Sequence, residues 1–309
     1  MGIFFDFLGS IFGYVLWFFF DAVSNYAVAI VLFTLLINLL MLPLIIKQRK
    51  SMIANAGMAE KEAELKKKYE KDPKKYNEEL ARLYEREGFN PASGCLSMLL
   101  PMLLWIGIIG AINRPLQNTL HISREKISEA VKVLPSLEET GIKVTRGYEE
   151  LQIVRHYSEL KDRLTMFNDE ERADIEEYSS GFDLMGINLL KRPSDCNFNE
   201  FSWIIPVLYF ISSVLMTYVS QKMMQTQQMT QGCLKFQPYL LSLFTFYISY
   251  TAPGAMGLYW MLNSVVGMVQ NLILNKFYNV YTIGAKNQAA RFARLQIEEA
   301  KVVSEKSID

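Results

Sequence analysis

The stretch AVAIVLFTLLINLLMLPLII at residues 27–46 decides the fold class, because it contains no charged side chain. A helix of about 20 residues crosses the hydrocarbon core of a bilayer, which is roughly 30 Å thick. Four more apolar stretches of similar length follow at 96–112, 201–219, 234–252 and 254–274. Five buried helices of a soluble protein fit less well, because soluble helices keep a charged face. The sequence therefore predicts an all-α polytopic membrane protein with five transmembrane helices.

The 309-residue chain has a formal net charge of zero, but its charges are distributed unevenly. Residues 47–88 contain 12 basic and 9 acidic side chains, and 220–237 contain two lysines and no acid. In contrast, residues 116–200 contain 11 basic and 17 acidic side chains. Basic segments next to a span stay on the cytoplasmic side. We therefore expect the N-terminus and the long acidic loop outside, and the C-terminus in the cytoplasm.

Two segments outside the five stretches are expected to be helical. Residues 1–22 are rich in phenylalanine, and a narrow, less apolar stripe favours an amphipathic helix in the outer interface over a sixth span. They lack the basic start and cleavage motif of an ordinary signal peptide. Residues 60–69 and 74–87 are dense in Glu, Lys, Leu and Ala, and Asp72-Pro73 separates them. Because proline interrupts a helix, this pattern predicts a helical hairpin, either as a solvated surface or as a docking arm.

The expected organisation follows from these segments in chain order. It comprises an outer-interface amphipathic helix at 1–22, a first transmembrane helix at 23–46, a cytoplasmic helical hairpin at 47–90, a second transmembrane helix at 91–113, an extracytoplasmic acidic loop with an inserted helix at 114–200, a third transmembrane helix at 201–220, a cytoplasmic linker at 221–233, a fourth transmembrane helix at 234–252, a fifth at 254–275 and a cytoplasmic basic tail at 276–309.

The chain lacks the motifs that carry common catalytic chemistry. No GxxxxGK[ST] nucleotide loop, HExxH or GxSxG motif occurs in the sequence. His121 and His156 are far apart and are expected to be surface residues rather than metal ligands. The three cysteines have no CxxC spacing, so they indicate neither a disulfide framework nor a zinc site. We therefore expect a protein that is not an enzyme and has no catalytic residue, metal or cofactor.

Polar residues recur at helical spacing in the first, third, fourth and fifth predicted spans, where they are costly. For a single Ser or Thr, hydrogen bonding between helices is the simpler explanation. Four such faces in one protein instead favour a hydrated groove. The residues expected to line this groove and bind a client are Thr34, Asn38, Tyr209, Ser213, Thr217, Tyr259, Trp260, Asn263 and Gln270.

The motifs LPLIIKQ at 42–48, GFNP at 88–91 and PGAMGLYW at 253–260 together resemble those of the YidC/Oxa/Alb family of membrane protein insertases. LPLIIKQ at 42–48 resembles the family's exit from its first core span, and GFNP at 88–91 resembles the end of its cytoplasmic hairpin. The most specific motif is PGA at 253–255 followed by GLYW at 257–260. The resemblance covers nearly the whole chain outside one insertion. It assigns a structural role to Pro43, Asn90, Pro91, Gly94, Pro253, Gly254 and Gly257.

This resemblance implies a function and a location. The chain would pass hydrophobic segments of nascent proteins into the bilayer along a hydrophilic groove, without ATP. It would be a multi-pass protein of the bacterial cell (plasma) membrane. Its partners would be nascent membrane proteins and the lipid bilayer, with the ribosome, the signal-recognition machinery and the Sec translocon as further candidates. The acidic loop would have an extracytoplasmic partner that the sequence does not identify.

Two features depart from the family pattern. The family usually carries an arginine in the middle of its first core span, where this chain has Asn38. An amide can donate and accept hydrogen bonds, but it cannot attract an acidic client flank. In addition, residues 116–180 form an insertion, in which we expect one helix over 148–178. Two alternatives therefore stay open: a diverged family member that acts as a membrane scaffold or assembly factor, and a small-solute transport or channel subunit.

Overall fold

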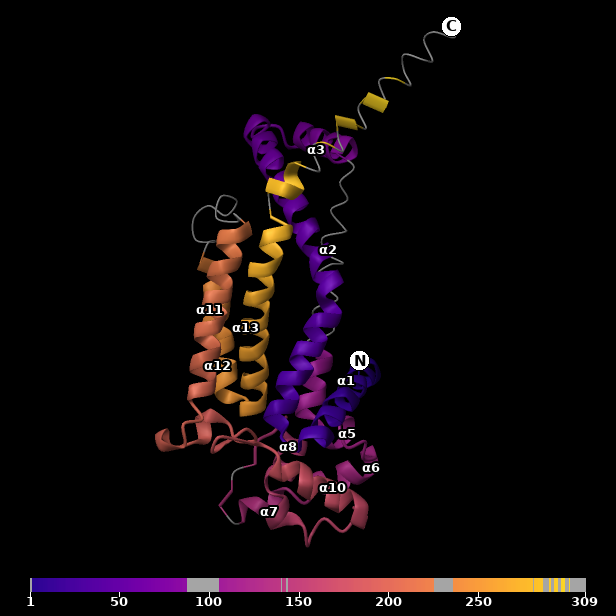
Figure 1. Cartoon of the computed structure of the whole chain (residues 1–309), viewed down its shortest axis with the longest axis vertical. Helices are drawn as coiled ribbons and strands as arrows, with labels where there is room; N and C mark the ends of the chain where they lie inside the picture. The colour runs from indigo at the N-terminus through magenta and orange to yellow at the C-terminus, as the bar shows by residue number, and fades with distance from the viewer. Residues whose placement is uncertain are drawn as a thin grey trace. The chain divides into compact units, whose positions relative to one another are not determined.

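The computed structural model describes residues 2–87, 106–224 except 140 and 143, 236–285 except 280, and scattered positions from 289 to 300 (Figure 1). The chain divides into two compact units. The first unit holds residues 1–40, 99–215 and 238–267, and the second holds 41–98, 216–237 and 268–309. Most of the expected second span lies outside the described residues, as do Asn90, Pro91 and Gly94.

The described residues include three helices that are long and apolar enough to cross a membrane. They lie within α2 (Tyr26–Lys68), α11 (Ile204–Met224) and α13 (Gly254–Phe277). The helix α12 (Gln237–Thr251) covers the expected fourth span but has only 15 residues. At 1.5 Å per residue, α12 is about 22 Å long, which is shorter than a hydrocarbon core. The described residues therefore fit an all-α membrane protein.

The helix α2 continues for 43 residues, through the expected boundary between the first span and the hairpin at 46–47. Pro43 does not end it, and the Ala-, Glu- and Lys-rich residues that follow favour helix. The second arm of the hairpin is α3 (Pro73–Glu87), which starts with proline at its first position. Asp72 Oδ1 accepts the Lys75 backbone N–H at 3.1 Å, as a helix N-cap does.

A hydrogen bond joins the two arms of the hairpin within the second unit. Tyr84 Oη donates to Glu62 Oε1 at 2.7 Å. This bond to a carboxylate, with lesser contributions from burial and the charge of Glu62, raises the pKa of Tyr84 to about 12. A cleft of about 440 Å³ between the arms is lined mainly by charged side chains, including Lys61, Lys68 and Arg86. The hairpin therefore presents a polar surface with a basic component.

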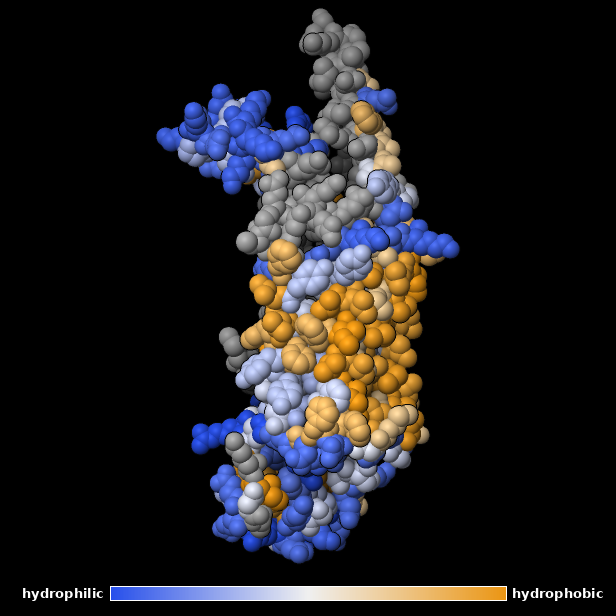
Figure 2. Space-filling model, turned by 90° about the vertical axis from the view of Figure 1, so that its left-hand side faces the viewer, coloured by the Kyte–Doolittle hydropathy of each residue, from blue (hydrophilic) through white to orange (hydrophobic). Residues whose placement is uncertain are grey.

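Residues 115–203 of the first unit form a small domain, here called the loop domain. Its elements are α5 (Pro115–Asn118), α6 (Arg124–Val131), α7 (Pro135–Glu138), α8 (Glu149–Arg155), α9 (Tyr157–Leu160), α10 (Asp169–Ser180), the antiparallel strands β1 (Asp183–Leu184) and β2 (Ile187–Asn188), and the 3₁₀ turns η1 (Pro193–Asp195) and η2 (Phe198–Glu200). Its surface is mainly hydrophilic, whereas the neighbouring helices of the same unit expose mainly apolar side chains (Figure 2).

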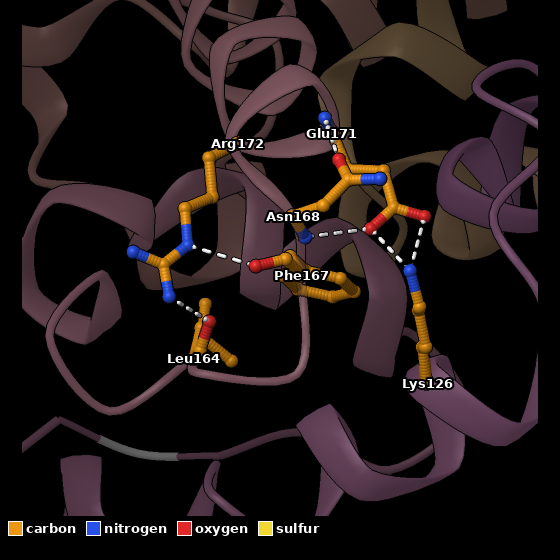
Figure 3. A network of polar contacts seen from close by, with 6 residues as sticks. All are labelled: Lys126, Leu164, Phe167, Asn168, Glu171 and Arg172. Atoms are coloured by element: carbon orange, nitrogen blue, oxygen red, sulfur yellow. Dashed lines mark hydrogen bonds and ion pairs between the residues drawn. The ribbon is translucent and has the colours of Figure 1, made fainter.

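The prediction of one helix over 148–178 was wrong, because the structure has three helices there. Asn168 starts α10: its side chain accepts the Glu171 N–H at 2.7 Å, and Glu171 accepts the Asn168 N–H at 2.9 Å. This capping box begins a new helix instead of continuing the previous one. Arg172 stabilises the preceding turn by donating to the carbonyls of Phe167 and Leu164 (Figure 3).

Glu171 also joins α10 to α6. Lys126 Nζ lies 2.7 Å from Glu171 Oε2 (Figure 3). Burial alone raises the pKa of Glu171, but hydrogen bonds from Lys126 and the Asn168 backbone outweigh it and hold the pKa below its ordinary value. The carboxylate is therefore charged at neutral pH, as its cap and ion pair require.

An aromatic cluster fixes the loop domain to α1 (Gly2–Val23) and the start of α2. The rings of Phe20, Tyr26, Tyr178 and Phe182 lie 4.2–6.4 Å apart between centroids. The Tyr26 N–H donates to the Gly181 carbonyl at 2.9 Å. Aromatic pairs at such distances contribute about 0.5–1.5 kcal/mol beyond the area they bury. The acidic loop is thus a folded domain attached to the N-terminal helices.

Asn168→Ala should destabilise α10 by about 1 kcal/mol, because it removes an N-cap and half of a capping box. Hydrogen exchange of the α10 amides in the solubilised full-length chain measures this effect. Ser180→Ala, an exposed substitution at the last residue of the same helix, should leave exchange unchanged. Equal exchange rates in the wild type and N168A would contradict the stabilising role of the cap.

Candidate functional site

Polar side chains lie between the apolar helices of the first unit, and most of them bond to each other. We call this set the intramembrane polar cluster. Its members are Thr34 and Asn38 on α2, Tyr209 and Ser213 on α11, Ser242 and Thr245 on α12, and Trp260 and Asn263 on α13.

The amide pair Asn38–Asn263 joins α2 to α13. Asn38 Nδ2 donates to Asn263 Oδ1 at 3.2 Å and to the Thr34 carbonyl at 2.9 Å. Both amides are half-buried. Thr34 is 1% exposed, and its hydroxyl donates to the Ile30 carbonyl at 2.6 Å. The middle of the first apolar stretch therefore carries a neutral side chain with a neutral partner.

Two further hydrogen bonds join α11 to α12. Tyr209 Oη donates to Thr245 Oγ1 at 2.8 Å, and Ser213 Oγ donates to Ser242 Oγ at 2.9 Å. The Tyr209 ring also lies 5.9 Å from the Trp260 ring on α13. The third, fourth and fifth apolar stretches thus turn polar faces toward one another. These cross-helix bonds fit the simpler explanation of the polar residues, which is hydrogen bonding between helices. The hydrated groove stays a prediction.

The glycines of the PGA–GLYW motif allow α13 to approach its neighbours closely. A Cβ atom at Gly257 would lie 2.8 Å from Ser249 Oγ and 2.9 Å from Ile205 Cγ2. At the start of α13, the Gly254 N–H donates to the Lys191 carbonyl and the Ala255 N–H donates to the Leu189 carbonyl, both at 2.9 Å. These bonds satisfy two of the N–H groups that a helix start leaves without partners.

The remaining predicted groove residues have different surroundings. Tyr259 is buried, at 4% exposure. Thr217 and Gln270 are half-buried and belong to the second unit. The structure therefore brings together Asn38 with Asn263, Tyr209 with Trp260, and Ser213 with Ser242, but it does not test whether any of these residues contacts a client.

Arg49 forms a second polar site, within the second unit, that the sequence analysis missed. It is only 4% exposed. Its guanidinium donates to Asn271 Oδ1 at 3.0 Å, to Asn275 Oδ1 at 3.0 Å and to the Tyr278 carbonyl at 2.8 Å. The carbonyl lies just beyond the C-terminus of α13, where a cation is favoured by the helix dipole. The sequence contains one signal for this site, because Asn271 and Asn275 are one helical turn apart near the end of the fifth stretch. Arg49 itself was not distinguishable from the other charged residues around it.

These contacts define the class of protein: an α-helical membrane protein whose apolar helices are joined by hydrogen-bonded polar side chains. Residues 18–281 match the family described as 60Kd inner membrane protein. The chain therefore belongs to this family, which is the YidC/Oxa/Alb family.

Individual relatives agree with this assignment. The chain is 26% identical over 266 residues to the membrane protein insertase YidC of Treponema denticola, covering 85% of this chain and 36% of that protein. It is 46% identical over 94 residues to the membrane protein insertase YidC of Caldanaerobacter subterraneus, and this match covers 30% of this chain and 46% of that protein. It is 24% identical over 283 residues to the chloroplastic ALBINO3-like protein 1 of Arabidopsis thaliana, covering 90% and 47%. The chain thus spans less than half the length of each of these relatives.

The Asn38–Asn263 pair should show a small coupling energy. A cross-helix hydrogen bond in a membrane contributes about 0.6 kcal/mol on average, since the separated helices also find partners. Thermal unfolding of N38L, N263L and the double variant in one detergent measures the coupling, and Leu40→Ala, at an exposed position, is the control. Strictly additive effects would show that the two amides do not interact.

Arg49→Lys should destabilise the second unit by about 1.5–3 kcal/mol, because an ammonium cannot reproduce three bonds from one planar guanidinium. Fluorescence-detected size exclusion after heating reports the stability of the solubilised protein. Lys50→Gln, at an exposed neighbouring position, serves as the control and should have a much smaller effect. If R49K and K50Q have equal midpoints, the buried contacts of Arg49 are not stabilising.

Proposed function

We propose that this chain is a membrane protein insertase and chaperone that passes hydrophobic segments of nascent proteins into the bilayer without ATP. The observation that carries this proposal is the intramembrane polar cluster in a chain of the YidC/Oxa/Alb family. The relatives named insertases match up to 85% of the chain, which supports the same activity here.

The proposed mechanism is an exchange of hydrogen bonds. A client segment entering hydrocarbon carries peptide groups whose loss of water costs several kcal/mol each. A cross-helix bond such as Asn38–Asn263 contributes only about 0.6 kcal/mol. Separating the two amides is therefore cheap compared with leaving a client's polar group without a partner. The amides then bond to the client until its apolar segment moves into lipid, and burial of that segment drives the step.

The topology completes the proposal. We infer five spans, with the second at 91–113 and the fourth around α12, an outer N-terminus and a cytoplasmic C-terminus. The excess of basic residues in 47–88 and 220–237 supports this orientation, and the apolar side chains that α1 exposes at Phe7, Ile11 and Phe18 support its place in the outer interface. The location is then the bacterial plasma membrane.

The hairpin of α2 and α3 is proposed to receive the client. Its charged cleft and the basic tail after α13 offer surfaces for a ribosome, the signal-recognition machinery or a translocon.

One observation favours a second candidate function, a scaffold or assembly factor. The loop domain has its own buried core and is fixed to α1 and α2 by four aromatic rings. A domain held in this way could present a partner-binding surface outside the membrane. The test of insertion decides between the two functions.

Reconstitution in liposomes with a small single-span client, scored by protease-protected insertion, tests the proposal. Asn38→Arg should accumulate normally and increase insertion of clients with acidic outer flanks by about two- to fivefold, because a partly hydrated charge pair contributes up to about 1 kcal/mol. Asn38→Gln keeps the amide without the charge and is the matched control.

Two outcomes would contradict the proposal. If N38R fails to accumulate in the membrane while N38Q does, the interior is dry and buries an unpaired charge, and a hydrated path at this position is excluded. If the wild-type protein inserts no client above protein-free liposomes, the scaffold function is favoured instead.

A further inference from the structure

Three bulky apolar side chains of the loop domain are exposed, and a half-buried tryptophan lies beside one of them. Met185 is 98% exposed, Phe198 is 74% exposed and Phe201 is 56% exposed. The Trp203 ring stacks on Phe198 at 4.8 Å between centroids. We call these four residues the apolar collar. Large exposed apolar side chains on an otherwise hydrophilic domain indicate an interaction surface.

The backbone at two of these residues is unfavourable for their side chains. The turn at Met185-Gly186 joins β1 to β2 with φ of 53° and 87°, as in a two-residue type I′ hairpin. That turn favours Asn or Asp followed by Gly, because both positions need positive φ. Phe201 follows η2 with φ of 56°. Among the described residues, the other non-glycine positions with positive φ are Ser24 and His121.

No packing within the described residues of the protein explains Met185, since it is almost fully exposed. A strained, exposed methionine gains nothing from the described part of the chain, so a contact outside the chain would account for it.

The position of the collar identifies that contact. A Cβ atom at Gly254 would lie 3.3 Å from Leu189 Cα and 3.5 Å from Ile205 Cδ1. The residue that follows the β1–β2 hairpin, the start of α11 and the start of α13 therefore meet at one junction of the first unit. Met185 is four residues before Leu189, and Phe201 and Trp203 are within four residues of Ile205. The collar residues are thus close in sequence to the segments that meet at the starts of two helices that are long and apolar enough to cross a membrane.

The exposed apolar surface continues from the collar along α11. Leu208, Ile211 and Leu215 are 45–48% exposed and lie on one face of the helix. Aromatic side chains are enriched where such a face leaves the hydrocarbon. The basic groups beside the collar are paired with carboxylates, with Lys191 Nζ 2.6 Å from Glu200 Oε2 and Arg192 Nε 2.7 Å from Asp195 Oδ2.

We propose that the apolar collar inserts into the headgroup–acyl boundary of the bilayer and holds the loop domain against the membrane. The occupant of this surface is lipid. Because the neighbouring charges are paired and the loop carries more acid than base, the contact is hydrophobic and does not depend on anionic lipid. This anchoring does not depend on insertase activity.

Site-specific photo-crosslinking of the full-length chain in vesicles tests the proposal. Benzoylphenylalanine at position 185 or 201 should form lipid adducts, detected by intact mass, at a level comparable to position 208 and roughly tenfold above the exposed position 129 on α6. The yields should be equal in phosphatidylcholine vesicles with and without phosphatidylglycerol. Yields at 185 and 201 no higher than at 129 would overturn the proposal, as would adducts in native membranes that contain a protein in place of lipid.

Met185→Asn gives a second, independent measurement. Asparagine tolerates the positive φ of this turn, so M185N should keep or raise the thermal midpoint in detergent. In lipid nanodiscs, the amides of residues 183–188 should exchange severalfold faster in M185N than in the wild type. A lower midpoint in detergent would show that Met185 packs within the protein, and unchanged exchange in nanodiscs would show that it contacts no lipid. Either result contradicts the anchor.

Discussion

Hydrocarbon offers no water to a polar group, and the arrangement of the apolar helices in this chain follows from that constraint. Asn38 and Asn263 bond to each other, as do Tyr209 with Thr245 and Ser213 with Ser242. Each bond specifies which helix faces lie together, although none contributes much free energy. Close approach at Gly257 supplies the van der Waals contact that such weak bonds cannot replace.

The two polar sites differ in charge: the first contains only neutral side chains, and the second contains the charged Arg49. In the first unit, an amide meets an amide, and the bond is weak enough to be exchanged for a bond to another polar group. In the second unit, a guanidinium makes three bonds to amide and carbonyl oxygens, and removing a buried charged group from its acceptors costs more. Arg49 therefore forms the stronger link, between α2 and the end of α13, and the amide pair forms the weaker one.

The long acidic loop folds into a packed domain although its helices are short. Few of these helices would persist alone. They persist because apolar residues such as Leu151, Ile153 and Leu164 are buried together and because Asn168, Glu171 and Lys126 fix the start of α10. Through Tyr178 and Phe182 the same domain packs on Tyr26, at the beginning of an apolar helix.

The sequence by itself determined the class of protein and most of its helices, because uncharged stretches of 20 residues can satisfy their backbone only as helices in lipid. It also predicted the hairpin turn at Asp72-Pro73. The family followed from short motifs, one of which includes Gly254 and Gly257, where other segments of the chain approach closely. The sequence did not predict that α2 passes unbroken through residue 46, or that 148–178 contains three helices, since both depend on local competition between propensity, capping and packing. Which polar residues pair, and that Arg49 is buried, was decided by tertiary structure alone. The sequence shows the spacing of polar side chains on one helix, but the partner of each depends on which helices lie beside it.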